Sequence, residues 1–334
     1  MEPPPKMKVS IIIPVYNVAP YIGHCIKSVM DQTYSDGIEC ILVNDVTPDD
    51  SIAIAERLIA DYNGPIQFRI LSHEQNRGLS ATRNTGIDAA TGDYLYFFDS
   101  DDEITPDCIE KLVHPILKDP TIEMVEGCYM TITTDRNNVM SERLVARPQL
   151  EFTSKETVRE FFFSNRYKNI FAWNKLVNRK FVLENQLYFS NVAAEDNFWH
   201  FHYFKYLSHL YIISDITYKY FKRPNSITTT PNKEYRNQMG FHYAEIVKNL
   251  TPNDSVREVK YFLTGFSWFY RKGPTNPVYR RVSSQFLEIL KNNHCIKEWC
   301  FLKFIVIASK FAPTRFFINS VYSIIFRIKL KLKG

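Results

Sequence analysis

The sequence lacks closely spaced cysteines, long apolar runs and an apolar segment at its start. Its six cysteines are scattered without a C-x-x-C spacing, so no zinc site of the common kind is implied. The opening MEPPPKMK has no apolar core, and we therefore expect no secretory signal and reduced thiols in a cytoplasm. The longest apolar stretches near the end, such as 316–326, are far shorter than the ~20 residues of a spanning helix. The sequence thus predicts a protein that does not cross a membrane.

The sequence also lacks the glycine-rich loops with which many α/β proteins hold phosphates. Neither G-x-x-x-x-G-K-[ST] nor G-x-G-x-x-G follows the first strand-like run. The sequence therefore lacks the loop with which kinases and dehydrogenases usually bind phosphate, which disfavours both classes. The phosphates of a ligand would need another binding partner, and a metal ion bound by carboxylates can be that partner.

Aromatic residues are plentiful, and basic residues gather at the end of the chain. Aromatics make up 15% of the sequence, with runs such as 161–163 that suit a ring-lined cleft, a membrane-facing surface or a core of large residues. From Lys297 onward, eight lysines and arginines accompany a single acid, a net charge of +7 that leaves −2 for the rest of a chain totalling +5. This distribution favours a basic tail on an anionic membrane surface over a nucleic-acid-binding body. A tail helix packed on the domain is the alternative.

Strand-like and helix-like segments alternate along the first part of the chain. Buried-strand patterns occur at 9–13 and 40–43, and 68–71 and 94–98 are expected as the third and fourth strands, with helical patterns between the strands. This order predicts an α/β doubly wound domain. Thr105 with Pro106 and a capping box of Thr153 with Glu156 mark two further helix starts.

Later segments set the expected domain boundary. Residues 124–133 and 211–220 have strand character, and from Glu234 onward the pattern is helical. We therefore expect a catalytic domain over residues 1–230 and a helical C-terminal region over 231–334.

Acidic residues follow two of the predicted strands. Asp45 follows the second strand, and Asp99, Ser100, Asp101 and Asp102 follow the fourth. Ligands of open α/β sheets bind beyond the carboxyl ends of the strands. Two acids separated by one residue offer oxygen ligands to a hard divalent cation, which commonly also binds substrate phosphates. The pattern indicates a diphosphate-bearing substrate, with simple capping of the next helix as the alternative.

Seven segments, in order over roughly the first 230 residues, resemble the family 2 glycosyltransferases of the GT-A fold. They are VSIIIPVYN (9–17), SVMDQTY (28–34), ILVND (41–45), NRGLSATRNTGI (76–87), GDYLYFFDSDD (92–102), WNKL (173–176) and AEDNFW (194–199). The resemblance implies a Rossmann-like mixed sheet flanked by helices, with a C-terminal α-helical extension.

The resemblance also implies roles for individual residues. Asp45 would bind a uracil base, Asp101 and Asp99 a divalent Mn²⁺ or Mg²⁺, and Asp196 would be the catalytic base, with Glu195 as its rival. The nucleotide-sugar pocket would comprise Pro14, Tyr16, Asn17, Asp45, Asn76, Arg83, Asp99 and Ser100. Trp173, Asn174 and Lys175 would lie on the acceptor side, and for Lys175 a phosphate contact and a solvated charge are both open.

The sequence departs from the family pattern at two places. Val46 stands where glycine is usual, so we expect that the pocket loop does not use a glycine conformation there. The usual Tyr-Arg pair is replaced by Tyr220-Phe221 with Arg223 close by, which puts a phosphate contact from this segment in doubt. His200 and His202, two residues apart on a predicted helix, face apart and are interpreted as structural.

The resemblance predicts an inverting enzyme that moves a single sugar from a UDP-sugar to a hydroxyl of a glycan or lipid-linked acceptor. It would act in cell-surface polysaccharide synthesis, in the cytoplasm on the inner face of the membrane. A sugar nucleotidyltransferase is an alternative, although Pro14 to Asn17 occupy the place of its glycine-rich loop. An inactive scaffold relative is another. A processive synthase would carry a Q-x-x-R-W motif and spanning helices, which the sequence lacks.

Overall fold

The computed structural model describes residues 7–34, 37–134, 140–163, 169–191 and 195–223, together with residues 284, 287, 288 and 291. The chain divides into two compact units, residues 1–162 with 167–230, and residues 163–166 with 231–334. The helical pattern and the basic tail predicted after residue 234 lie outside the described residues, apart from those four positions. No helix in the described part is long and apolar enough to span a membrane.

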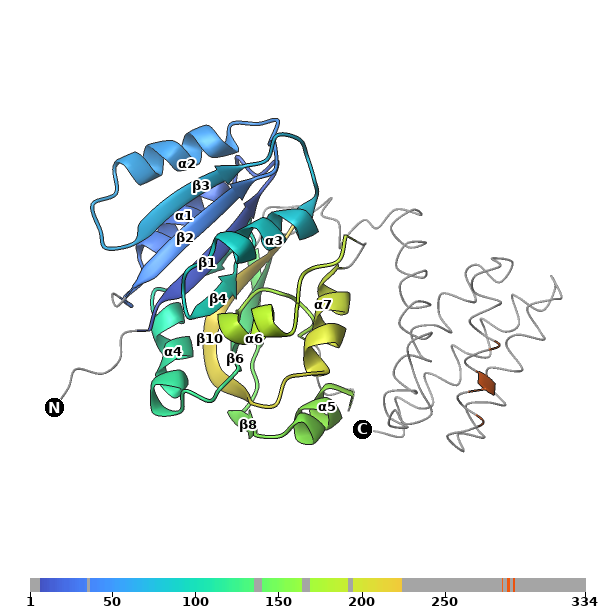
Figure 1. The fold of residues 1–334 in the computed structure, drawn as a ribbon. Coiled ribbons are helices and arrows are strands. Elements are labelled where there is room, and N and C mark those ends of the chain that lie inside the picture. The colour runs from blue at the N-terminus through green and yellow to red at the C-terminus, as the bar shows by residue number, and fades with distance from the viewer. Residues whose placement is uncertain are drawn as a thin grey trace. The chain divides into compact units, whose positions relative to one another are not determined.

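A mixed β-sheet forms the centre of the first unit (Figure 1). Its strands are β1 (Val9–Val15), β2 (Ile38–Asn44), β3 (Gln67–Ser72), β4 (Tyr94–Phe97), β5 (Glu103–Ile104), β6 (Met124–Thr134), β7 (Met140–Val145), β8 (Leu150–Phe152), β9 (Lys175–Asn178) and β10 (Leu210–Lys222). The order is β3-β2-β1-β4-β9-β6-β10-β5, while β7 pairs with β6 and β8 with β10. Strands β3, β2, β1 and β4 are parallel, and β9 runs antiparallel to both β4 and β6.

Seven helices accompany the sheet in the described part of the chain. They are α1 (Ile22–Met30), α2 (Ser51–Ala60), α3 (Leu79–Ala89), α4 (Cys108–Lys118), α5 (Lys155–Phe163), α6 (Arg179–Glu184) and α7 (Glu195–Phe204). Helix α1 packs against α2, α3 lies against β1 and β2, and α4 contacts β6, β9 and β10. The predicted α/β fold with a mixed sheet and flanking helices is confirmed.

Strand β1 is buried on both faces of the sheet. All seven of its residues are buried, the pattern expected of a strand between two helical layers. Its odd-numbered residues Ile11 and Ile13 belong to the core that contains the apolar side of α1. Ile12 points the other way, toward Gly86 of α3.

Two helix starts differ from their predictions by one or two residues. Helix α4 begins at Cys108 rather than after Thr105, because the Thr105 hydroxyl donates to Asp107 at 2.8 Å instead of accepting from the helix. Ahead of α5 the cap is Ser154, whose hydroxyl accepts from the backbone N–H of Thr157 at 3.2 Å. The Thr153–Glu156 capping box was therefore placed one residue early.

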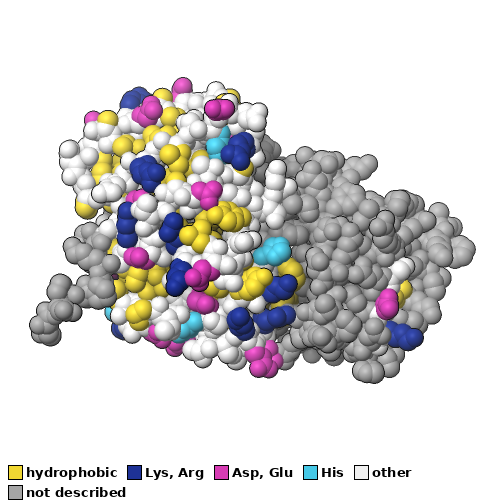
Figure 2. All heavy atoms as spheres, in the orientation of Figure 1, with side chains coloured by type: hydrophobic (Ala, Val, Ile, Leu, Met, Phe, Trp, Pro, Cys, Tyr) yellow, Lys and Arg dark blue, Asp and Glu magenta, His cyan; other side chains and the backbone are white. Residues whose placement is uncertain are grey.

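Charges of both signs are mixed over the visible face of the described part. In Figure 2, lysine and arginine side chains lie among aspartate and glutamate side chains. On this face the described residues form no extended basic surface of the kind that binds nucleic acid.

The close approach of α3 to β1 gives a stability prediction. A Cβ added to Gly86 would lie 2.3 Å from Ile12 Cγ2, so Gly86→Ala is expected to destabilise the fold by about 1–3 kcal/mol. Gly23 of α1 is the matched control, because a Cβ there would lie 3.9 Å from Ile54 and Leu58. Gly23→Ala should be neutral or stabilising by up to about 1 kcal/mol. Urea denaturation measures both, and equal midpoints for the two variants would contradict the packing.

Candidate active site

The predicted acids lie at one edge of the sheet. Asp45 follows β2 and Asp99 follows β4 within two residues, and β2, β1 and β4 are parallel, so their carboxyl ends share an edge. Strand β9 is antiparallel to β4, so the loop that ends at Asn174 reaches this same edge. Side chains from distant parts of the sequence therefore converge here, as in other α/β proteins.

Asp45 is buried and firmly oriented. The backbone N–H groups of Arg77 and Gly78 donate to its two carboxylate oxygens at 2.8 and 2.7 Å, and Asn76 Nδ2 donates to its backbone carbonyl at 3.0 Å. His73 Nδ1 lies 2.7 Å from Asp45 Oδ1. Burial alone would raise the pKa of Asp45, but these hydrogen bonds from Arg77, His73 and Gly78 lower it. The carboxylate is therefore ionised and held in one orientation.

His73 was not anticipated from the sequence. Its Nε2 lies 2.9 Å from the Thr85 hydroxyl, so the imidazole links Asp45 to α3. The available signal was position alone, because His73 directly follows β3, and the carboxyl end of β3 is at the same sheet edge.

The expectation for Val46 is wrong. Val46 adopts φ = 57°, the left-handed conformation that favours glycine. Hydrogen bonds on both sides hold it there, since Asp45 N donates to Val15 O at 3.1 Å and Thr47 N donates to Asn44 Oδ1 at 2.9 Å. A β-branched residue in this region costs roughly 1–3 kcal/mol.

Two neighbours at this edge share the same backbone feature. The described residues contain four non-glycine positions with positive φ, and Asn17 and Asn174 are two of them, with φ of 55° and 60°. Asn17 N donates to the Thr47 hydroxyl at 2.8 Å, which ties the loop after β1 to the loop after β2. Unusual backbone conformations thus gather around the candidate site.

Arg83 lies at the centre of the acidic cluster. Its side chain is 2% exposed, and Nη2 donates to Asp99 Oδ1 at 2.9 Å. Nη1 donates to Glu195 Oε1 at 2.7 Å and to Asp196 Oδ1 at 2.9 Å. The sequence placed Arg83 in the nucleotide pocket, whereas in the structure its guanidinium group joins the acid after β4 to the Glu-Asp pair that begins α7.

One cation among three carboxylates leaves the cluster with a net negative charge. Burial raises the pKa of Asp196 to about 7; Arg83 opposes this rise, while Glu195 and Asp99 add to it. Conversely, Asp196, Asp99 and Glu195 raise the pKa of Arg83, although its burial opposes the rise. A carboxyl group whose pKa is near the working pH is suited to accept a proton during catalysis.

Asp101 and Asp102 have different surroundings. Asp102 is buried and accepts from the Tyr218 hydroxyl and from the backbone N–H of Phe221, both at 2.8 Å. Asp101 is more open, and its Oδ2 lies 3.3 Å from Arg223 Nε. Asp102 therefore fastens β10 to the loop after β4, while Asp101 remains accessible to a ligand.

Asp99 and Asp101 fit a divalent cation. Burial and the nearby Asp99 charge raise the pKa of Asp101 to about 6, so the ionised pair is electrostatically unfavourable without more positive charge. A hard cation bound by carboxylate oxygens would supply that charge. Arg223 supplies part of it in the structure, and its guanidinium carbon lies 3.3 Å from the centroid of the Tyr21 ring.

The three residues expected on the acceptor side are enclosed. Trp173 stacks on Phe171 and Tyr218, with ring centroids 4.6 and 4.3 Å apart. Asn174 accepts from the Thr217 hydroxyl at 2.7 Å. These contacts fix the loop before β9, and the expectation that its residues meet an acceptor stays a prediction.

Lys175 is fully buried, so the interpretation as a solvated charge is wrong. Its Nζ donates to Phe171 O at 2.5 Å and lies 3.9 Å from Glu126 Oε2. Burial lowers the pKa of Lys175 to about 8. Glu126 also pairs with Arg147 at 2.7 Å, so a buried charged cluster supports the loop. The backbone N–H of Ala172 in this loop in turn hydrogen-bonds Asp196.

The remaining predicted residues vary in exposure. Pro14 is buried in β1, Ser100 is buried, and Tyr16 is half exposed at the end of β1.

His200 is buried, and its Nδ1 lies 2.6 Å from the Asp196 backbone carbonyl one turn earlier. Because burial holds the pKa of His200 well below its ordinary value, the ring is neutral, in agreement with a structural role.

Comparison with known proteins agrees with this geometry. A family model described as Glycosyl transferase family 2 matches residues 10–181, more than half of the chain. EpsJ of Bacillus subtilis strain 168, described as an uncharacterized glycosyltransferase, is 35% identical over 229 residues. The alignment covers 67% of this chain and 64% of EpsJ, so the chain spans slightly less than two thirds of that relative.

Solved structures share the fold. S. aureus TarS 1–349 in complex with UDP-GlcNAc has a TM-score of 0.59 at 17% identity, covering 91% of this chain and 92% of TarS. The mannosyltransferase PcManGT from Pyrobaculum calidifontis, in complex with GDP-Man and Mn²⁺, has a TM-score of 0.53 at 16% identity, covering 94% and 84%. The chain therefore belongs to glycosyl transferase family 2, and its fold is the GT-A fold.

Proposed function

We propose that the protein transfers a single sugar, with inversion, from a UDP-sugar to a hydroxyl of a glycan or lipid-linked acceptor in cell-surface polysaccharide synthesis. The observation that carries the proposal is the Arg83 contact set, which holds Asp99 and Asp196 on one guanidinium group. Asp99 on the donor side and the candidate base Asp196 are thereby kept at a fixed separation. A direct displacement requires reacting groups that are positioned in this way.

In the proposed reaction the acceptor hydroxyl attacks the anomeric carbon of the donor. Asp196 accepts the hydroxyl proton as the new carbon–oxygen bond forms. The bond to the nucleoside diphosphate breaks, and its electron pair leaves with the diphosphate. Arg83 keeps Asp196 oriented toward the site, and no covalent enzyme intermediate is needed.

Asp101 and Asp99 would hold a divalent cation, Mn²⁺ or Mg²⁺, beside the diphosphate. When bound, such an ion acts as a Lewis acid that stabilises the charge on the leaving group. The solved PcManGT structure is a complex with GDP-Man and Mn²⁺, which supports this assignment by analogy of fold alone.

Asp45 would select the nucleotide base. An ionised carboxylate accepts the N3–H of uracil, whereas cytosine presents an acceptor at the same position. The TarS complex contains UDP-GlcNAc and the PcManGT complex contains GDP-Man, so the fold alone does not choose the base. Asn76, Tyr16, Asn17, Pro14 and Ser100 complete the proposed pocket.

We further propose that the basic tail attaches the enzyme to the inner face of the cell membrane. The proposal rests on the sequence, because the net charge of +7 from Lys297 onward suits anionic headgroups. A sugar nucleotidyltransferase and an inactive relative are the remaining alternatives. Both differ from the proposal in the products that they release.

A panel of nucleotide sugars tests the proposed function. The purified protein should release nucleoside diphosphate from a UDP-sugar in the presence of Mn²⁺ or Mg²⁺ and an acceptor, and CDP- and GDP-sugars should be poor donors. Asp45→Ala should lower the ratio of UDP to CDP affinity by about 10- to 100-fold, since a hydrogen bond to a charged group is lost. A purely structural role would lower both affinities alike. Conversion of a UDP-sugar and added pyrophosphate into UTP and sugar 1-phosphate would instead indicate a nucleotidyltransferase, and no turnover an inactive relative.

The metal assignment predicts opposite results for two neighbouring acids. Asp101→Asn should abolish the gain in UDP affinity that Mn²⁺ gives in calorimetry. Asp102→Asn should keep that gain but lower the thermal unfolding midpoint, because Asp102 accepts from Tyr218 and Phe221. An unchanged metal effect in the Asp101 variant would remove this residue from the cation site.

The base assignment predicts a pH profile as well as a loss of rate. A base works only when deprotonated, so kcat/KM of the wild type should rise with pH and level off above about 7, the value to which burial raises the pKa of Asp196. Asp196→Asn should keep UDP binding, lose roughly a hundredfold or more in turnover and lose this pH limb.

Glu195→Gln is the matched control for this substitution, because Glu195 contacts the same Arg83 nitrogen. It should be less damaging and should keep the pH limb. Near-normal transfer by the Asp196→Asn enzyme would place the base elsewhere.

A further inference from the structure

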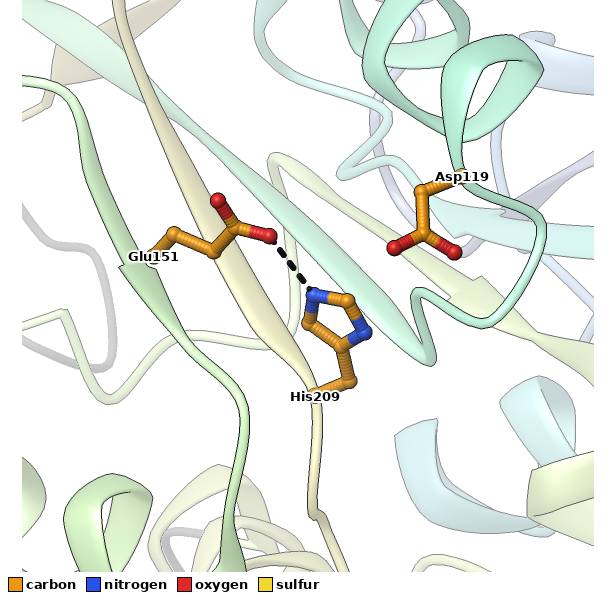
Figure 3. Close-up of side chains that lie close together, drawn as sticks. All are labelled: Asp119, Glu151 and His209. Carbon is orange, nitrogen blue, oxygen red and sulfur yellow. Dashed lines mark hydrogen bonds and ion pairs between the residues drawn. The ribbon is translucent and has the colours of Figure 1, made fainter.

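We propose that Asp119, Glu151 and His209 form a second divalent-metal site, of zinc type, at the edge of the sheet opposite to the catalytic acids. Each side chain offers one ligand atom, and these three atoms lie within 4.8 Å of one another. Figure 3 shows Glu151 and His209 pointing toward each other, with Asp119 on the other side of the imidazole ring. Imidazole nitrogen and carboxylate oxygen are both ligands that zinc takes in proteins.

The three residues come from separate elements. Asp119 ends α4 and precedes β6, His209 directly precedes β10, and Glu151 lies in β8. Strands β6 and β10 run parallel to β4, because β9 is antiparallel to both β4 and β6. Their amino ends therefore lie at the edge opposite to Asp99, and the proposed ion is separate from the cation of the donor site.

Sheet register places Glu151 beside His209. Glu151 is the antiparallel partner of Tyr211 across β8 and β10, so Glu151 and His209 are diagonal neighbours on one face of this pair. His209 Nε2 lies 3.0 Å from Glu151 Oε1. The backbone N–H of His209 donates to Glu123 at 3.1 Å, which fixes the position of the ring's attachment point.

Thr121 orients Asp119 and lies beside the imidazole ring of His209. Thr121 Oγ1 and N both donate to Asp119 Oδ1, at 2.6 and 2.9 Å, and these bonds lower the pKa of Asp119. Thr121 Oγ1 also lies 3.0 Å from His209 Nδ1 and can accept the Nδ1 proton. In that tautomer Nε2 offers its lone pair to a metal ion on the side of Glu151.

An ion bound to Nε2 would lie beside the Glu151 carboxylate, which is 3.0 Å from that nitrogen, and both groups could bind it. The arrangement also resembles that of metal-binding histidines in general, which donate their other ring N–H to an oxygen. Here that oxygen is the Thr121 hydroxyl, and Asp119 keeps its second carboxylate oxygen for the ion.

The chemical types of the three ligand atoms indicate the class of ion. Imidazole together with carboxylate suits zinc and its neighbours, whereas magnesium and calcium prefer oxygen alone. Ligand atoms around tetrahedral zinc are roughly 3.3 Å apart at bond lengths near 2 Å, so the outermost pair must close by about 1–1.5 Å. The Glu151 side chain is 46% exposed and can make this movement. The ion would fasten β8 to the turn between α4 and β6.

Zinc retention tests the proposal. The full chain is treated with EDTA, loaded with ZnCl₂ in excess Mg²⁺, passed over a desalting column and assayed for metal by elemental analysis. About one equivalent of zinc should stay with the wild type and with Asp101→Asn, and should be lost in Glu151→Gln and His209→Gln. Zinc should also raise the thermal unfolding midpoint of the wild type.

His114→Gln is the matched control, because His114 is an exposed histidine on α4 and should not affect retention. Should His209→Gln fail to fold, the exposed Glu151 carries the test. Equal retention by Glu151→Gln and the wild type would overturn the proposal. So would a wild type that retains no zinc.

Discussion

The contact of Arg83 with three carboxylates is the interaction on which the candidate site depends. A buried guanidinium group is tolerated only where charge partners and hydrogen bonds replace its hydration, and Asp99, Glu195 and Asp196 do so here. A lysine could not make the same contacts, since a single ammonium nitrogen cannot span carboxylates on two sides. Loss of Arg83 would leave these acids to repel one another.

The position of Arg83 follows from backbone packing. Helix α3 can lie close to β1 because Gly86, three residues after Arg83, has no side chain to meet Ile12. The loop before β9 approaches from the other side, where buried contacts of Trp173, Asn174 and Lys175 hold it. The acidic cluster is therefore rigid for reasons that lie in the core rather than at the surface, as pre-organised sites require.

The sequence predicted those features that depend on local pattern. Apolar, β-branched runs located the strands, and acids at strand ends indicated the candidate site, because both signals are contained in a few consecutive residues. It failed where distant pairs decide the outcome. Lys175 reads as a surface charge until Glu126 is placed beside it, and the role of Arg83 depends on residues more than 110 positions away. The short strands β5 and β8 have only two and three residues, too few to show a period.

The left-handed conformation of Val46 has a consequence for the affinity with which the protein binds its donor. The unfavourable backbone energy belongs to the free protein, where the hydrogen bonds of Asp45 N and Thr47 N maintain the conformation. If the loop relaxes when a nucleotide enters, that energy contributes favourably to the observed affinity, although no atom of the ligand accounts for it. In a close relative with glycine at this position, the left-handed conformation would cost little energy, so this contribution to the affinity would be absent. Two such enzymes with identical ligand contacts would then differ in affinity because of the backbone of the empty state alone.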